Sequence, residues 1–169
     1  MRAHQIFQEI SPGLARDIFH YLRTEQKEVY ATAVGALAAQ RKLRPVFVTK
    51  KRPEEQYVWL HKIAQLKFAD GIGENILQMW LLKARKEMLV TFLDEAGIAH
   101  DGDGGVDDLP EELDGVKVKA AVDKLLAGHP AEEVALYLHL FQQQRSEGWP
   151  EIAEVLENDE RIRLAPATA

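Results

Sequence analysis

Carboxylates and glycines are concentrated between Ile98 and Glu112, a composition that can gather oxygen ligands for a calcium ion as an EF-hand loop does. With Asp101 at the first ligand position, Asp103 and Asp107 fall at the third and seventh, but Val106 stands where the loop requires glycine. If the loop is aligned so that a glycine falls at the required position, the first and last ligand positions hold no carboxylate. Asp101, Asp103 and Asp107 are therefore metal-ligand candidates, and a solvated turn is the favoured interpretation.

Six cations and no carboxylate lie in the twelve residues from 41 to 52, with the aromatic Phe47 among them. Such a segment is a candidate for binding nucleic acid or another polyanion, because Lys and Arg contact phosphates and release counterions. The alternative is a helix C-terminus followed by a solvated edge strand, which the acidity of the whole chain favours. The candidate residues are Arg41, Lys42, Arg44, Lys50, Lys51 and Arg52.

The residue types needed for catalysis do not form a recognisable motif. None of the six histidines stands in a His-Glu-x-x-His pattern, and neither Ser11 nor Ser146 lies in a Gly-x-Ser-x-Gly elbow. The glycines of residues 71–73 lack the rest of a phosphate loop and fit a turn between helices, with Asp70 as the N-cap. Without cysteine, thiolate catalysis and disulfides are excluded. We predict no catalytic residue and no cofactor, and we favour a non-enzyme.

Charge is divided unevenly along the chain, whose net charge is −6. Met1–Phe92 carries 15 Lys/Arg against 9 Asp/Glu, whereas Leu93–Ala169 carries 6 against 18. Such asymmetry points to a polyanionic partner, to pairing between copies, or to acidic helices that cover the basic half of the same chain. We favour the last of these.

These observations predict a protein-interaction module with an electrostatically polarised surface, either bound to a protein partner or self-associated as a homodimer. A nucleic-acid-associated protein that uses residues 41–52 is the alternative, and a metal-dependent or small-molecule enzyme is third. The first residues carry no apolar run typical of a secretion signal, and no run elsewhere is long enough to span a membrane. We therefore expect a cytoplasmic protein with no membrane partner.

Apolar spacing at three and four residues predicts an all-α fold of about seven helices in a single domain, residues 1–169, with a possible subdomain boundary near 98–112. The longest helix, Gly73–Ala96, is expected to be the centre of the bundle. The β-branched segment Pro45–Thr49 could pair with Arg161–Leu164 as a minimal two-stranded β element. The other helices are expected at about 12–22, 26–42, 53–69, 116–127, 131–144 and 150–157.

Overall fold

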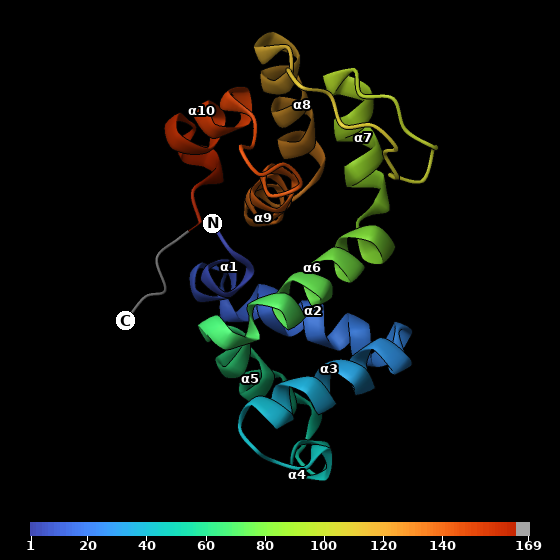
Figure 1. The fold of residues 1–169 in the computed structure, drawn as a ribbon, viewed down its shortest axis with the longest axis vertical. Helices are drawn as coiled ribbons and strands as arrows, with labels where there is room; N and C mark the ends of the chain where they lie inside the picture. The colour runs from blue at the N-terminus through green and yellow to red at the C-terminus, as the bar shows by residue number, and fades with distance from the viewer. Residues whose placement is uncertain (165–169) are drawn as a thin grey trace. The chain divides into compact units, whose positions relative to one another are not determined.

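The computed structural model describes residues 1–164 as an all-α structure with no strand in that range (Figure 1). The all-α prediction is confirmed, but the described residues form ten α-helices rather than about seven. The helices are α1 (Ala3–Glu9), α2 (Pro12–Glu25), α3 (Lys27–Gln40), α4 (Pro45–Thr49), α5 (Pro53–Ala64), α6 (Asp70–Ala84), α7 (Lys86–Ala96), α8 (Gly115–Gly128), α9 (Ala131–Gln142) and α10 (Pro150–Asn158), with 3-10 helices η1 (Lys67–Ala69) and η2 (Glu160–Ile162).

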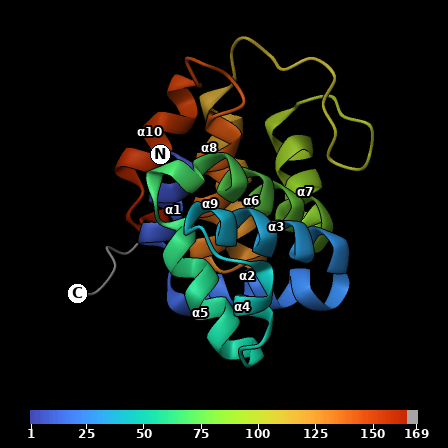
Figure 2. The same cartoon turned by 60° about the horizontal axis from the view of Figure 1, so that its bottom comes forward.

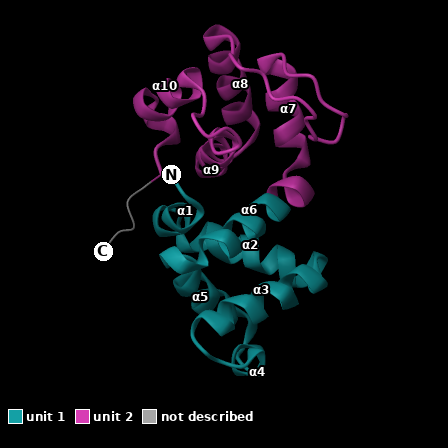
Figure 3. Ribbon diagram, viewed as in Figure 1, with its two compact units in different colours: residues 1–80, 165–169 teal, residues 81–164 magenta. Residues whose placement is uncertain are grey.

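Residue contacts divide the described chain into two compact units, residues 1–80 and 81–164 (Figure 3). The division falls inside α6, whereas the boundary suggested by the sequence, at 98–112, lies within the second unit. The first unit carries 12 Lys/Arg against 8 Asp/Glu, a net charge of +4, and the second carries 9 against 19, a net charge of −10. Organisation as a single domain stays a prediction.

The first unit is built around α2, which packs against α3 and α5. Its start is as the sequence predicts: Pro12 lies in the first turn, and Ser11 Oγ accepts a hydrogen bond from the backbone N–H of Leu14 at 3.1 Å. Phe7 of α1 stacks on Phe19 of α2 with ring centroids 6.0 Å apart. The buried face of α2 consists of Leu14, Ala15, Ile18, Phe19 and Leu22.

Helix α1, which the sequence analysis does not predict, is bound to the start of α6. The backbone N–H of His4 donates to Asp70 Oδ1 at 3.0 Å, and His4 Nδ1 lies 2.9 Å from the same oxygen. Asp70 is the first residue of α6 and not its N-cap, and its carboxylate binds His4 of α1. Gly73 allows the close approach, because a Cβ there would lie 3.3 Å from the Phe7 ring.

The predicted two-stranded β element is wrong at both of its segments. Pro45–Thr49 is helix α4: proline presets the helical φ and lacks an N–H that the first turn could not pair, and Arg44 before it is extended. The apolar spacing then places Val48 inside, where its exposed fraction is 0%. Arg161–Leu164 is not a strand either, because residues 160–162 form the 3-10 helix η2, in which Ile162 is buried. β-branched composition alone is a weak signal.

The predicted central helix Gly73–Ala96 is two helices, because α6 ends before Arg85 and α7 begins after it. At Arg85 the backbone has φ −127° and ψ 28°, outside the helical region. Its Nε and Nη2 donate to the two carboxylate oxygens of Glu133 at 2.6 and 2.9 Å. No glycine or proline marks the break, and the local apolar spacing does not signal it. The break instead coincides with this long-range ion pair.

The second unit packs α7 beside α8, as Figures 1 and 2 both show, and α9 contacts α8 and α10. Gly97 ends α7 in the left-handed conformation, with φ 74°, as the sequence predicts. Phe92 of α7 lies edge-on to Tyr137 and Phe141 of α9, with centroids 5.3 and 5.2 Å apart. Trp149 stacks on Phe141 at 4.8 Å and completes the aromatic core.

We predict that Glu133→Ala lowers the free energy of unfolding by about 2 kcal/mol, because it leaves the partly buried guanidinium of Arg85 without its carboxylate. Glu133 itself is 6% exposed. Urea denaturation followed by circular dichroism measures the change. The control Glu147→Ala, at an exposed position, should leave the unfolding midpoint in place, and an equal loss in both variants would contradict the assignment.

Candidate functional site

The basic segment of the first unit forms an exposed surface on and beside α4, the short helix between α3 and α5 (Figure 2). Five of the six predicted cations are exposed and Lys51 is half-exposed. Within the first unit, none of the six side chains forms an ion pair or a hydrogen bond with another residue. We call this the α4 surface: Arg41, Lys42, Arg44, Lys50, Lys51 and Arg52, with the apolar side chains Val46, Phe47 and Trp59.

The nearest carboxylates along the chain do little to neutralise this surface. Glu54, two residues beyond Arg52, is bound to Arg16 of α2 with a shortest N–O distance of 2.7 Å. The hydrogen bond from that guanidinium holds the pKa of Glu54 below its usual range. Glu55 is exposed at the start of α5. The α4 surface therefore keeps a strong excess of positive charge.

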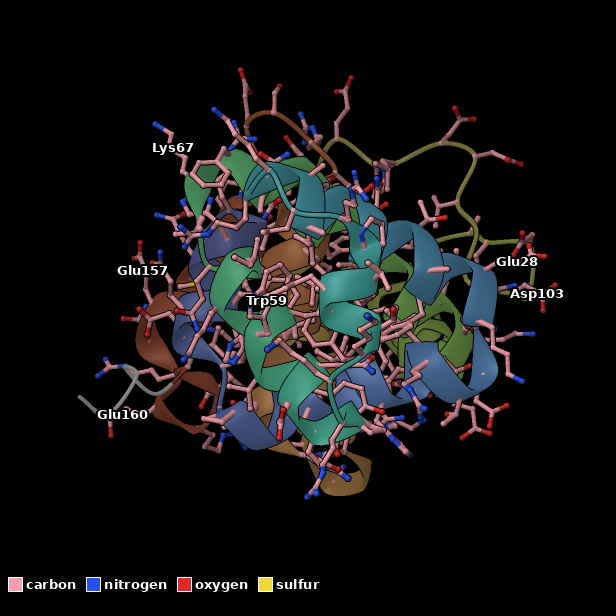
Figure 4. The ribbon with its side chains drawn as sticks, turned by 90° about the horizontal axis from the view of Figure 1, so that it is seen from below. Glu28, Trp59, Lys67, Asp103, Glu157 and Glu160 are labelled. Atoms are coloured by element: carbon pink, nitrogen blue, oxygen red, sulfur yellow. The ribbon has the colours of Figure 1, made fainter. Side chains whose placement is uncertain are left out.

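Apolar side chains lie among the cations. Val46 is 48% exposed and Phe47 is 47% exposed. The Phe47 ring contacts the half-exposed Trp59, with centroids 6.3 Å apart, and Lys51 Nζ lies 4.8 Å from the Phe47 centroid. Figure 4 shows Trp59 on α5, where α4 and α5 pass each other. The surface thus combines apolar and cationic groups.

A strained turn connects α3 to α4. Lys42 has φ 55°, the left-handed conformation that normally takes glycine at a helix C-terminus. Its N–H donates to the carbonyl of Ala39 at 2.9 Å, and the N–H of Leu43 donates to Ala38 at 3.0 Å. These hydrogen bonds end α3 and place Lys42 beside α4. A lysine therefore adopts the left-handed backbone conformation that glycine would adopt without strain.

The buried amide of Gln56, 5% exposed, fixes the position of α4. Its Nε2 donates to the carbonyl of Lys51 at 2.8 Å, and its Oε1 accepts from the hydroxyl of Tyr30 on α3 at 2.6 Å. Burial raises the pKa of Tyr30, so the phenol stays protonated as a donor. The sequence analysis does not identify Gln56; the only signal is its spacing from Leu60 and Ile63 on the buried face of α5.

The calcium-ligand candidates lie in the loop between α7 and α8, and two of them have other partners. Asp101 Oδ1 accepts hydrogen bonds from the N–H groups of Asp103 and Gly105 at 2.7 and 3.0 Å, which hold the pKa of Asp101 below its usual range. The Asp103 carboxylate is paired with Lys86, and Asp107 is exposed. The residues described contain no group of three or more acidic or histidine side chains placed to hold a metal ion.

Four of the six histidines lie on separate helices, His100 and His129 lie outside helices, and several are bonded inside the fold. His20 Nδ1 lies 3.1 Å from the hydroxyl of Tyr57, and His61 Nε2 lies 2.7 Å from the carbonyl of Phe7. Tyr57 and His61 also line a cavity of about 650 Å³ between α2 and α5, with the ion pair of Arg16 at its rim. Tyr57 and His61 thus each have an internal hydrogen-bond partner beside this cavity.

Within residues 1–164, every helix is too short or too polar to cross a lipid bilayer. Comparisons with protein-family models, with curated proteins and with solved structures found no match. The chemistry of the α4 surface is therefore the basis on which a function can be argued.

We predict that Lys42→Gly raises the free energy of unfolding by about 1 kcal/mol, because glycine adopts the left-handed conformation without steric cost. Urea denaturation provides the measurement. Lys50→Gly is the matched control: Lys50 has φ −72° in the right-handed region, so glycine there should destabilise the protein. A loss of stability in both variants would contradict the strain at Lys42.

We predict that Gln56→Leu lowers the free energy of unfolding by about 2 kcal/mol, because the buried hydroxyl of Tyr30 and the carbonyl of Lys51 lose their partner. The same substitution at the exposed Gln40 is the control and should have little effect. Amide hydrogen exchange in α4 should accelerate in the Gln56 variant only, and unchanged protection there would show that Gln56 does not hold this helix.

Proposed function

We propose that this chain is a non-enzymatic interaction protein that binds an acidic protein segment through the α4 surface. The observation that carries the proposal is the presence of exposed apolar side chains among six cations that form no ion pair within the first unit. Each half of this combination supports a different property of the partner.

The apolar side chains favour a protein partner. Val46 and Phe47 are each about half exposed, and covering such area stabilises a complex by roughly 25 cal/mol per Å². Protein interfaces typically place aromatic and aliphatic groups at the centre and charged groups at the rim, which is the composition found here. A purely electrostatic contact would leave these side chains in water.

The cations favour an acidic partner. Like charges within a short segment repel one another, and carboxylates brought by a partner would relieve that repulsion. Charges at the rim of an interface chiefly raise the association rate and the specificity, so binding should be fast and sensitive to salt.

Binding to nucleic acid is the second candidate, because the same six cations could contact phosphates. Lys51 Nζ lies over the Phe47 ring at 4.8 Å from its centroid, so it occupies one face on which a base would stack. The net charge of −6 also opposes non-specific binding to a polyanion. An enzyme remains the third proposal, and the cytoplasmic location stays a prediction.

The test measures binding of two fluorescent probes at about 50 mM salt: a peptide of about twelve residues that repeats Glu-Glu-Leu, and a single-stranded oligonucleotide of about twenty nucleotides. We expect the peptide to bind, and Lys50→Gln/Lys51→Gln/Arg52→Gln to weaken it at least about fivefold. Fluorescence anisotropy gives both affinities, and circular dichroism checks the fold.

The matched control is Lys27→Gln/Lys62→Gln/Lys67→Gln, which removes three exposed cations of the same unit outside the α4 surface. Equal weakening in the two triple variants would mean that only the net charge matters. Binding of the oligonucleotide but not of the peptide would replace the proposal with the nucleic-acid function. Binding of neither probe would overturn both.

A further inference from the structure

We propose that the partner of the α4 surface is a second copy of this chain, which docks its acidic segment, residues 106–112, onto that surface. This inference rests on the proposed function and names the occupant. The segment reads Val106-Asp107-Asp108-Leu109-Pro110-Glu111-Glu112 and lies in the loop between α7 and α8.

The acidic segment carries four exposed carboxylates without a partner. The side chains of Asp107, Asp108, Glu111 and Glu112 form no ion pair or hydrogen bond within the described part of the chain. The preceding carboxylates differ in this respect, since Asp101 binds backbone N–H groups and Asp103 is paired with Lys86. The four unpartnered carboxylates are therefore available to meet cations from outside the chain.

The composition of the acidic segment also matches the apolar part of the α4 surface. Val106, Leu109 and Pro110 alternate with the carboxylates and are only half-buried. A partner that presents both kinds of side chain can cover Val46 and Phe47 while its carboxylates meet the cations around them. An unbroken run of acidic residues could satisfy only the charges.

The acidic segment is held in place by its own unit. The indole Nε1 of Trp149 donates to the carbonyl of Pro110 at 2.9 Å, and the Arg145 guanidinium donates to the carbonyl of Glu111. Leu113 is buried directly after the segment, and Asp114 caps α8. A segment ordered before it binds loses less conformational entropy on binding, which favours affinity.

The charges of the two units are complementary between copies. The unit that contains the α4 surface has a net charge of +4, and the unit that contains the acidic segment has −10. The acidic unit of one copy is therefore attracted to the basic unit of another. Because each copy carries both surfaces, the contact can close reciprocally into a two-fold dimer or continue as a chain of copies.

The first experiment measures molar mass by light scattering over a hundredfold range of concentration. At about 50 mM salt we expect masses above the 19.1 kDa of one chain, and at about 500 mM a return toward it. A single-chain mass at every concentration would overturn the inference, and so would a salt-dependent change of shape without a change of mass, which indicates pairing within one chain.

The decisive experiment reverses the charges of one surface at a time. Asp107→Lys/Asp108→Lys and Lys50→Glu/Lys51→Glu should each remain a single chain, because each variant brings like charges together. Mixed at equal concentrations, they should associate with an affinity within about tenfold of the unmodified protein, because each surface again meets its opposite. Failure of the mixture to associate, with both variants folded by circular dichroism, would overturn the inference.

The outcome also separates this inference from the proposed function. If the chain does not self-associate but the Glu-Glu-Leu peptide still binds in a manner that depends on Lys50, Lys51 and Arg52, the α4 surface serves another acidic protein and only the inference fails. If self-association and peptide binding are both absent, both proposals fail.

Discussion

The first unit depends on one buried amide. Gln56 is fixed in α5, and its two ends bind the hydroxyl of Tyr30 in α3 and the carbonyl of Lys51 just after α4. Helix α4 has five residues, too few to be stable alone, so its conformation depends on such tertiary contacts together with the burial of Val48. A polar side chain inside the unit is thus a precondition for an organised cationic surface outside it.

The fold tolerates electrostatic repulsion at that surface. Most of the ion pairs described elsewhere bring together residues on different elements, such as Arg16 with Glu54, Lys124 with Glu95 and Arg161 with Asp123. The cations from Arg41 to Arg52 have no such partner within the first unit. Since exposed ion pairs contribute little to stability, their absence costs the folded state little, and the unneutralised charge remains free to act over distance.

Local signals in the sequence were sufficient where one residue controls the backbone. Ser11 and Pro12 marked the start of α2, and Gly97 marked the end of α7. The failures have a common cause, which is that a distant partner decides the local structure. Nothing near Arg85 reveals that Glu133, 48 residues away, accompanies the break between α6 and α7.

The sequence predicts only part of the candidate surface. The six cations were identified from composition, but the structure places them around a helix and not along an edge strand. The sequence also favours acidic helices that cover the cations, and this stays a prediction. Neither the buried amide of Gln56 nor the contact of Trp59 with Phe47 could be inferred, because both depend on how α4 and α5 pack.

The hydrogen bond from Trp149 to Pro110 links the acidic segment to the aromatic core of its unit. By thermodynamic linkage, a partner that binds the ordered segment also stabilises the packing of Trp149, and a change that loosens Trp149 weakens the partner by the same free energy. Recognition at residues 106–112 would then report the folded state of the whole unit. A nascent or damaged chain with the same seven residues would carry the charges without the shape, and it would be excluded from the assembly.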